Sequence, residues 1–70
     1  MPKYDLQGIN GNAFCVLGYT TRAMRREHYS TDEIRNFEGR ATSRDYDYLL
    51  SLCMEKIDEI NARVGINSIY

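Results

Sequence analysis

The sequence lacks the residues from which metal centres and disulfide frameworks are built. It has two cysteines, Cys15 and Cys53, and a single histidine, His28. No CxxC or HxxxH spacing occurs, so no zinc-binding motif is present. Two cysteines do not make a disulfide framework, and both lie in apolar runs of expected helices, where a free cysteine behaves as a small hydrophobe. We therefore expect no metal, no cofactor and a reducing compartment.

Long apolar runs are missing as well. No stretch approaches the ~20 apolar residues that a membrane-spanning helix needs. The start, Met-Pro-Lys-Tyr-Asp, is not followed by the apolar core of a secretory signal peptide. These two absences predict a cytoplasmic protein with no membrane partner.

Neither sign of charge dominates the chain. Nine lysines and arginines stand against ten acids, and with a formal net charge of −1 no overall field draws the protein to nucleic acid or to an anionic membrane. The charges are nevertheless segregated along the chain. Residues 22–44 contain six arginines and four acids, a balance of +2, whereas residues 45–70 contain five acids and two cations, a balance of −3.

What the sequence does contain is enough apolar residues for one core. Hydrophobic residues make up 43% of the chain and charged residues 27%, with one proline and no low-complexity tract, which is the composition of a folded protein. A chain of 70 residues is close to the lower limit for folding without disulfides or metal. We expect residues 1–70 to form a single domain.

The first helix is predicted over residues 12–27. A turn-forming segment rich in glycine and asparagine, residues 8–11, precedes it, and either Asn10 or Asn12 is the expected N-cap. Steps of three and four residues predict an inward stripe made of Phe14, Leu17, Thr21 and Met24. Gly18 lies beside this stripe, and a glycine inside a helix indicates either a close backbone approach or a shallow cleft.

The second helix, predicted over residues 31–40, has the clearest local signal. Ser30 is followed three residues later by Glu33, the pattern of a capping box. Tyr29 before the cap and Ile34 after it complete a hydrophobic staple. Together these signals fix where the helix starts.

The third helix is predicted to be the longest, over residues 45–64. Alternating steps of four and three predict inward positions at Tyr46, Leu50, Cys53, Ile57, Ile60 and Val64. Gly65 is expected to end the helix, with Ile66 folding back onto it. The apolar tail, residues 66–70, is expected either to pack or to pair as a strand with residues 4–6.

Three helices with short connections can enclose one core. The predicted fold is therefore mainly α, a small three-helix domain. Pairing of the two end segments would add a minimal two-stranded β element that joins the termini.

No catalytic group stands out. A histidine near a helix end, as His28 is, is typical of a cap or a surface residue. Cys15 and Cys53 are both expected to face inward, and no cluster of cations activates either thiol. The glycine-rich residues 8–12 lack the lysine and hydroxyl of a P-loop, and the acids of residues 45–47 are explained by the favourable electrostatics of a helix start. The protein is therefore predicted not to be an enzyme.

Two groups of side chains are candidates for binding. The arginine-rich region, residues 22–44, is able to hold an acidic protein or a nucleic-acid backbone. The alternative for it is a solvated face with local ion pairs, such as Arg22 with Glu27. The apolar and tyrosine residues of the third helix exceed what one face can bury, which indicates an interface and makes a homodimer a candidate. The candidate interaction surface comprises Arg22, Arg26, Tyr46, Tyr48 and Leu52.

Two segments resemble short proteins encoded by bacteriophages and prophages. DLQGINGNAF, residues 5–14, is similar to the D-L-x-G-x-x-G-N-A-F-like start of those proteins, and DYDYLL, residues 45–50, to their D-Y-D-x-L helix start. The resemblance covers about sixteen of the 70 residues and leaves the C-terminal tail unmatched. It implies an accessory protein that acts in the cytoplasm of a bacterial host by binding a host protein.

The sequence thus leads to one functional hypothesis and one alternative. The hypothesis is a non-enzymatic protein–protein interaction module that binds a host protein and is a candidate homodimer. The alternative is a nucleic-acid-binding accessory protein that uses the arginine-rich region.

Overall fold

Three helices make up the chain in the computed structural model, which describes the backbone of residues 3–69 and the side chains of residues 3–64. α1 spans Ala13–Arg26, α2 spans Thr31–Ala41 and α3 spans Tyr46–Ile69. The prediction of a mainly α, three-helix fold is confirmed. Within the described residues, no helix has the length and apolar character needed to cross a membrane.

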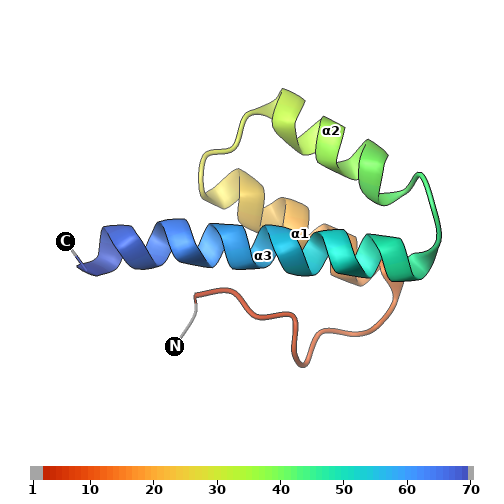
Figure 1. Cartoon of the computed structure of the whole chain (residues 1–70), viewed down its shortest axis with the longest axis horizontal. Coiled ribbons are helices and arrows are strands. Elements are labelled where there is room, and N and C mark those ends of the chain that lie inside the picture. The colour runs from red at the N-terminus through yellow and green to blue at the C-terminus, as the bar shows by residue number, and fades with distance from the viewer. Residues whose placement is uncertain (1–2, 70) are drawn as a thin grey trace.

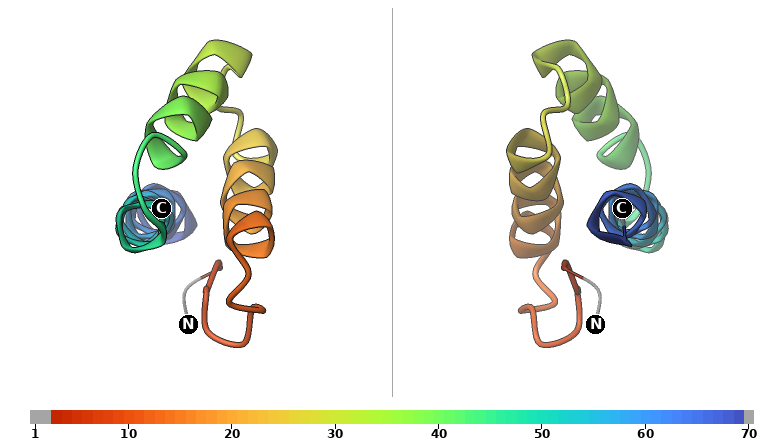
Figure 2. Two further views of the ribbon diagram at one scale, coloured as in Figure 1. Left: turned by 90° about the vertical axis from the view of Figure 1, so that its right-hand side faces the viewer. Right: turned by 90° about the vertical axis from the view of Figure 1, so that its left-hand side faces the viewer.

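The helices are arranged around the pair formed by α1 and α3. α2 lies across one side of this pair, and the N-terminal segment, residues 3–12, lies across the opposite side (Figures 1 and 2). Each helix packs against the other two. The core therefore lies between the three helices, and the N-terminal segment covers the side that α2 leaves open.

The start of α1 follows from two asparagines in series. The Asn12 side chain accepts a hydrogen bond from the Phe14 backbone amide at 2.8 Å, so Asn12 is the N-cap. Asn10 accepts in turn from the Asn12 backbone amide at 2.9 Å. Of the two predicted candidates, Asn12 therefore caps the helix and Asn10 holds the cap in place.

The end of α1 is a Schellman motif with a histidine where glycine is usual. The His28 amide donates to the Arg25 carbonyl at 3.2 Å, and the Tyr29 amide donates to the Met24 carbonyl at 3.0 Å. His28 adopts φ +71°, in the left-handed region. The side chain of His28 is exposed, as the sequence predicted for a residue at a helix end.

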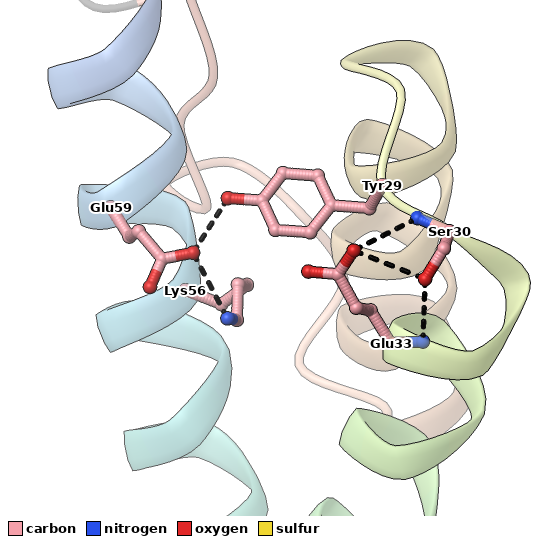
Figure 3. Close-up of polar contacts among 5 residues, drawn as sticks. All are labelled: Tyr29, Ser30, Glu33, Lys56 and Glu59. Carbon is pink, nitrogen blue, oxygen red and sulfur yellow. Dashed lines mark hydrogen bonds and ion pairs between the residues drawn. The ribbon is translucent and has the colours of Figure 1, made fainter.

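The capping box of α2 is confirmed. The Ser30 hydroxyl accepts from the Glu33 amide at 3.1 Å, and the Glu33 carboxylate accepts from the Ser30 amide at 3.2 Å (Figure 3). Tyr29 and Ile34, the predicted staple residues, are both buried.

The core face of α1 differs from the predicted stripe. Thr21 and Met24 are buried as expected, but Leu17 is only half-buried and Phe14 points into solvent. The face that packs inward consists of the smaller side chains Val16, Thr20 and Ala23 together with the large side chain of Met24. Thr20 tolerates complete burial because its hydroxyl donates to the Val16 carbonyl at 2.9 Å.

α3 buries Leu49, Leu52, Cys53, Ile57 and Ile60. Of the other predicted inward residues, Leu50 and Val64 are half-buried and Tyr46 is exposed. The expected stop at Gly65 is wrong, because the helix continues to Ile69. Glycine costs a helix only about 1 kcal/mol relative to alanine, and no proline follows it to enforce an end. The predicted fold-back of Ile66 is therefore absent.

The optional β element does not form. Residues 66–69 are helical, and residues 3–69 contain no strand. The extended N-terminal segment is instead held by the side-chain amide of Asn61. The Tyr4 amide donates to Asn61 Oδ1 at 2.9 Å, and Asn61 Nδ2 donates to the Tyr4 carbonyl at 2.8 Å. One amide side chain thus takes the place of a neighbouring strand.

Tyr4 anchors the N-terminal segment in the core. Its ring is buried and meets Tyr19 edge-on, with ring centres 6.3 Å apart. Its hydroxyl donates to Glu27, which also accepts from Lys3 at 2.8 Å. The hydrogen bond from Lys3 and then that from Tyr4 lower the pKa of the Glu27 carboxyl. The Tyr19 hydroxyl completes the attachment by accepting from the Asp5 amide at 2.9 Å.

Candidate protein-binding surface

Phe14 is the most exposed large apolar side chain of the described residues, with 86% of its surface accessible. Its position follows from the packing of α1. The Asn12 cap fixes the helix register, and Val16, two residues after Phe14, is buried with 3% exposure. Consecutive residues of a helix are about 100° apart, so Phe14 points about 200° away from Val16. The packing that buries Val16 therefore turns Phe14 outward.

An apolar hollow of about 260 Å³ opens beside Phe14. It lies where α1 and α3 begin and α2 ends (Figure 1). We call this surface the Phe14 face; it consists of Phe14, the hollow walls Ala13, Leu17, Ala41, Tyr46 and Leu49, and the rim residues Thr42, Arg44 and Asp45. The Tyr46 hydroxyl donates to the Gly11 carbonyl, so its polar end is used within the chain.

A second hollow adjoins Phe14 on its other side. It holds about 380 Å³ and includes Ile9, Cys15, Gly18 and Tyr19. Apart from the adjoining residues and backbone of α1 itself, no atom lies within 4 Å of the position that a Cβ would take at Gly18. Of the two interpretations of this glycine, the shallow cleft fits the structure and the close backbone approach does not.

Arg22 and Arg26 share a third hollow, and Arg22 also borders the second hollow beside Phe14. They line a hollow of about 170 Å³ together with Tyr4 and Tyr19. Both arginines are exposed, and neither forms an ion pair within residues 3–64. The expected pairing of Arg22 with Glu27 is absent, because Lys3 and Tyr4 occupy that carboxylate.

The arginine-rich region does not form one continuous surface. The last turns of α1 and the connection between α2 and α3 lie toward opposite ends of the molecule (Figure 1). The arginines of residues 22–26 are thus separated from those of residues 40–44. The positive balance of residues 22–44 is spread over the molecule rather than concentrated.

The five residues of the candidate interaction surface lie in four different settings. Arg22 and Arg26 are together, whereas Tyr46 belongs to the Phe14 face. Tyr48 is half-buried, with the Arg44 guanidinium 4.8 Å from its ring centre. Leu52 is buried in the core with 9% exposure, so its assignment to a surface is wrong.

The third helix therefore exposes less apolar surface than its sequence suggested, because Leu49 and Leu52 are both absorbed by the core. Met54 is 53% exposed and lies in a groove between the N-terminal segment and α3. This groove holds about 610 Å³, and its charged lining residues are Asp5 and Asp58.

The groups with chemical reactivity are dispersed. Cys15 is exposed, which corrects the expectation that it faces inward, whereas Cys53 is buried as expected. Burial raises the pKa of the Cys53 thiol, so this thiol is a poor nucleophile. Among the described residues, no three histidine, cysteine or acidic side chains gather as a metal site would require.

A polar cluster ties the α1–α2 connection to α3 (Figure 3). The Tyr29 hydroxyl donates to Glu59 at 2.6 Å, and Lys56 donates to the same carboxylate at 3.0 Å. The Arg63 guanidinium lies 4.7 Å from the Tyr29 ring centre. The hydrogen bond from Tyr29 is the main cause of the lowered pKa of Glu59, and burial is the main cause of the raised pKa of Tyr29. Every side chain of this cluster contacts another one, which is typical of a cluster that stabilises the fold.

The Phe14 face was missed by the sequence reasoning, which placed Phe14 in the core. The cap at Asn12 gives no signal for it, because a cap fixes where the helix begins and not which face packs inward. Comparison of the chain with protein-family models, curated proteins and solved structures gave no match. The Phe14 face is thus identified from its own geometry.

Proposed function

We propose that the protein is a non-enzymatic protein-interaction module and that the Phe14 face is its contact surface. The observation that supports this proposal is the 86% exposure of Phe14. Burying a phenylalanine removes about 150–250 Å² from water. Full burial of a phenylalanine side chain is worth about 1.5–3 kcal/mol relative to leaving it exposed. A partner chain that covers the ring gains the part of this free energy that exceeds the cost of association.

The surroundings of Phe14 distinguish it from an isolated exposed residue, which is common on protein surfaces. The ring stands beside an apolar hollow with Leu17 and Tyr46 in its walls. An aromatic anchor next to a pocket is the arrangement that dominates the energy of many protein interfaces. Arg44 and Asp45 add a charged rim, which favours specific orientation over affinity.

The proposed partner is a host protein in the cytoplasm of a bacterium. The support for this part of the proposal is the resemblance of residues 5–14 and 45–50 to phage and prophage proteins. The first of these segments ends at Phe14, and the second begins at the rim residue Asp45. Both segments therefore reach the Phe14 face.

The test is a capture experiment from bacterial lysate with matched variants. The tagged wild-type chain, Phe14→Ser and Met54→Ser are compared, each with and without nuclease. Met54 is the control because it is also an exposed apolar residue but lies in a different groove. We expect a stoichiometric protein band with the wild type and with Met54→Ser, resistant to nuclease, and its loss with Phe14→Ser.

Both substitutions change exposed side chains, so circular dichroism should show all three chains folded. Retention of the band by Phe14→Ser, or equal loss in both variants, would contradict the assignment of the Phe14 face. Absence of any protein band with the wild type would contradict the binding of a host protein.

A second candidate function is nucleic-acid binding through Arg22 and Arg26. The observation that favours it is that both guanidinium groups line one hollow with two tyrosine rings and lack carboxylate partners within residues 3–64. Phosphates would bind the arginines, and a base could stack on an aromatic ring. Affinity should then fall steeply with salt. Replacing both arginines by glutamine should reduce the slope of log K against log salt by about 2. Salt-independent binding would reject this candidate.

A further inference from the structure

We propose that a second copy of the chain covers the Phe14 face of the free protein, in a two-fold symmetric dimer. This inference rests on the proposed function, since both use the same face, and it names an occupant of that face when no other protein is bound. A host protein would then compete with the second copy for Phe14.

The shape of the Phe14 face is the first argument. A two-fold interface uses the same patch on both subunits, so a single face must supply both the projection and the recess that receives it. Phe14 projects, and the apolar hollow of about 260 Å³ opens directly beside it. An apolar cavity of about 150 Å³ is already large enough to hold benzene. The hollow of each copy therefore has room for the phenyl ring of the other.

The charges of the Phe14 face are the second argument. Its two charged residues, Arg44 and Asp45, are adjacent in the chain and opposite in sign. Both are exposed, and neither forms an ion pair within residues 3–64. A face with one sign of charge would repel its own copy, whereas this face is neutral and self-complementary. In the dimer, Arg44 approaches Asp45 of the partner subunit, and symmetry repeats the contact.

The size of the molecule sets the expected strength. A standard interface buries about 800 Å² on each partner, which is roughly one-sixth of the 5094 Å² surface of this chain. The Phe14 face lies at one end of a molecule whose two shorter Cα dimensions are 28 and 14 Å. An end of this size allows an interface in the small, weak class. We therefore expect a dimer that forms and dissociates with concentration, which a competing protein is able to displace.

The test is sedimentation of the purified chain over a concentration series that reaches about 1 mM, the weak end of measurable specific association. We expect the average mass of the wild type to rise from one chain toward two. Phe14→Ser should raise the dissociation constant at least ~100-fold, because each dimer loses two buried rings. Met54→Ser should behave as the wild type. Arg44→Glu should raise the dissociation constant about 10-fold, since it places like charges opposite each other.

A wild-type chain that stays monomeric throughout the series would overturn the inference. Dimerisation that is unchanged by Phe14→Ser would also overturn it, because the contact would then lie elsewhere. Neither result bears on the proposed function. That proposal is tested by whether the wild type captures a bacterial protein and whether Phe14→Ser loses it. Conversely, a Phe14-dependent dimer without any captured protein would support the inference and contradict the host-protein proposal.

Discussion

His28 closes α1 with φ +71°, a conformation in which an L-residue is strained and glycine is not. The perturbation that exploits this is His28→Gly, which should stabilise the protein. The side chain is exposed, so its removal opens no cavity. The backbone amide, which donates to the Arg25 carbonyl, is retained in the variant.

The magnitude follows from two opposing effects. A left-handed L-residue costs about 1–2 kcal/mol, which glycine relieves. The greater freedom of glycine in the unfolded chain costs about 0.5–1 kcal/mol. At the midpoints of these ranges, the net expectation is a stabilisation of about 0.75 kcal/mol. In a domain of this size each kcal/mol moves the Tm by about 4–8 °C, so the Tm should rise by about 3–6 °C.

The assay is thermal unfolding followed by circular dichroism, with His28→Ala as the matched control. Alanine removes the same imidazole but keeps the penalty of the left-handed backbone, so its Tm should equal or fall below that of the wild type. A His28→Gly variant less stable than His28→Ala would refute the reasoning. It would mean that the freedom glycine adds to the unfolded chain costs more than relief of the left-handed backbone gains.

Three further outcomes test other parts of the structure. A maleimide should label Cys15 rapidly and Cys53 only on unfolding, as mass spectrometry of the folded chain would show, since Cys15 is exposed and Cys53 is buried with a raised pKa. Asn61→Ala should destabilise the fold by about 1–3 kcal/mol in urea titrations, because it leaves the backbone groups that it pairs with unsatisfied; an unchanged midpoint would mean that water replaces the amide. Glu27 and Glu59 have lowered pKa values in the folded state, so their contribution to stability should be complete above about pH 4.5 and be lost as the pH falls below it. Replacing both by glutamine should flatten the acid side of the Tm–pH profile.

Local signals in the sequence predicted the helix starts well. Ser30 with Glu33, and Asn12 at the entry to α1, act through hydrogen bonds between residues two or three apart, so their partners are visible in the sequence itself. The number and order of the helices followed from these caps and from the apolar spacing.

What failed depended on contacts between distant parts of the chain. Phe14 has the spacing of a core residue, and only packing of the smaller Val16 against the rest of the fold turns it outward. The exposure of Phe14, and hence the candidate surface, could not be read from periodicity alone. The Asn61 clamp joins residues 57 positions apart and has no sequence signature. Gly65 predicts the end of the third helix because glycine often follows the last helical residue. Glycine does not prevent a helix from continuing, and α3 extends beyond it.

The clamp between Tyr4 and Asn61 also bears on the order in which the fold is completed. Asn61 is synthesised 57 residues after Tyr4, whereas the Glu27 carboxylate that receives the Tyr4 hydroxyl is made after only 23. Contacts of long sequence separation cost more loop entropy and form late. The backbone groups of Tyr4 thus gain their native partner only when Asn61 has been made. Until α3 emerges, the N-terminal segment is attached to α1 only through the contacts of Tyr19 and Glu27.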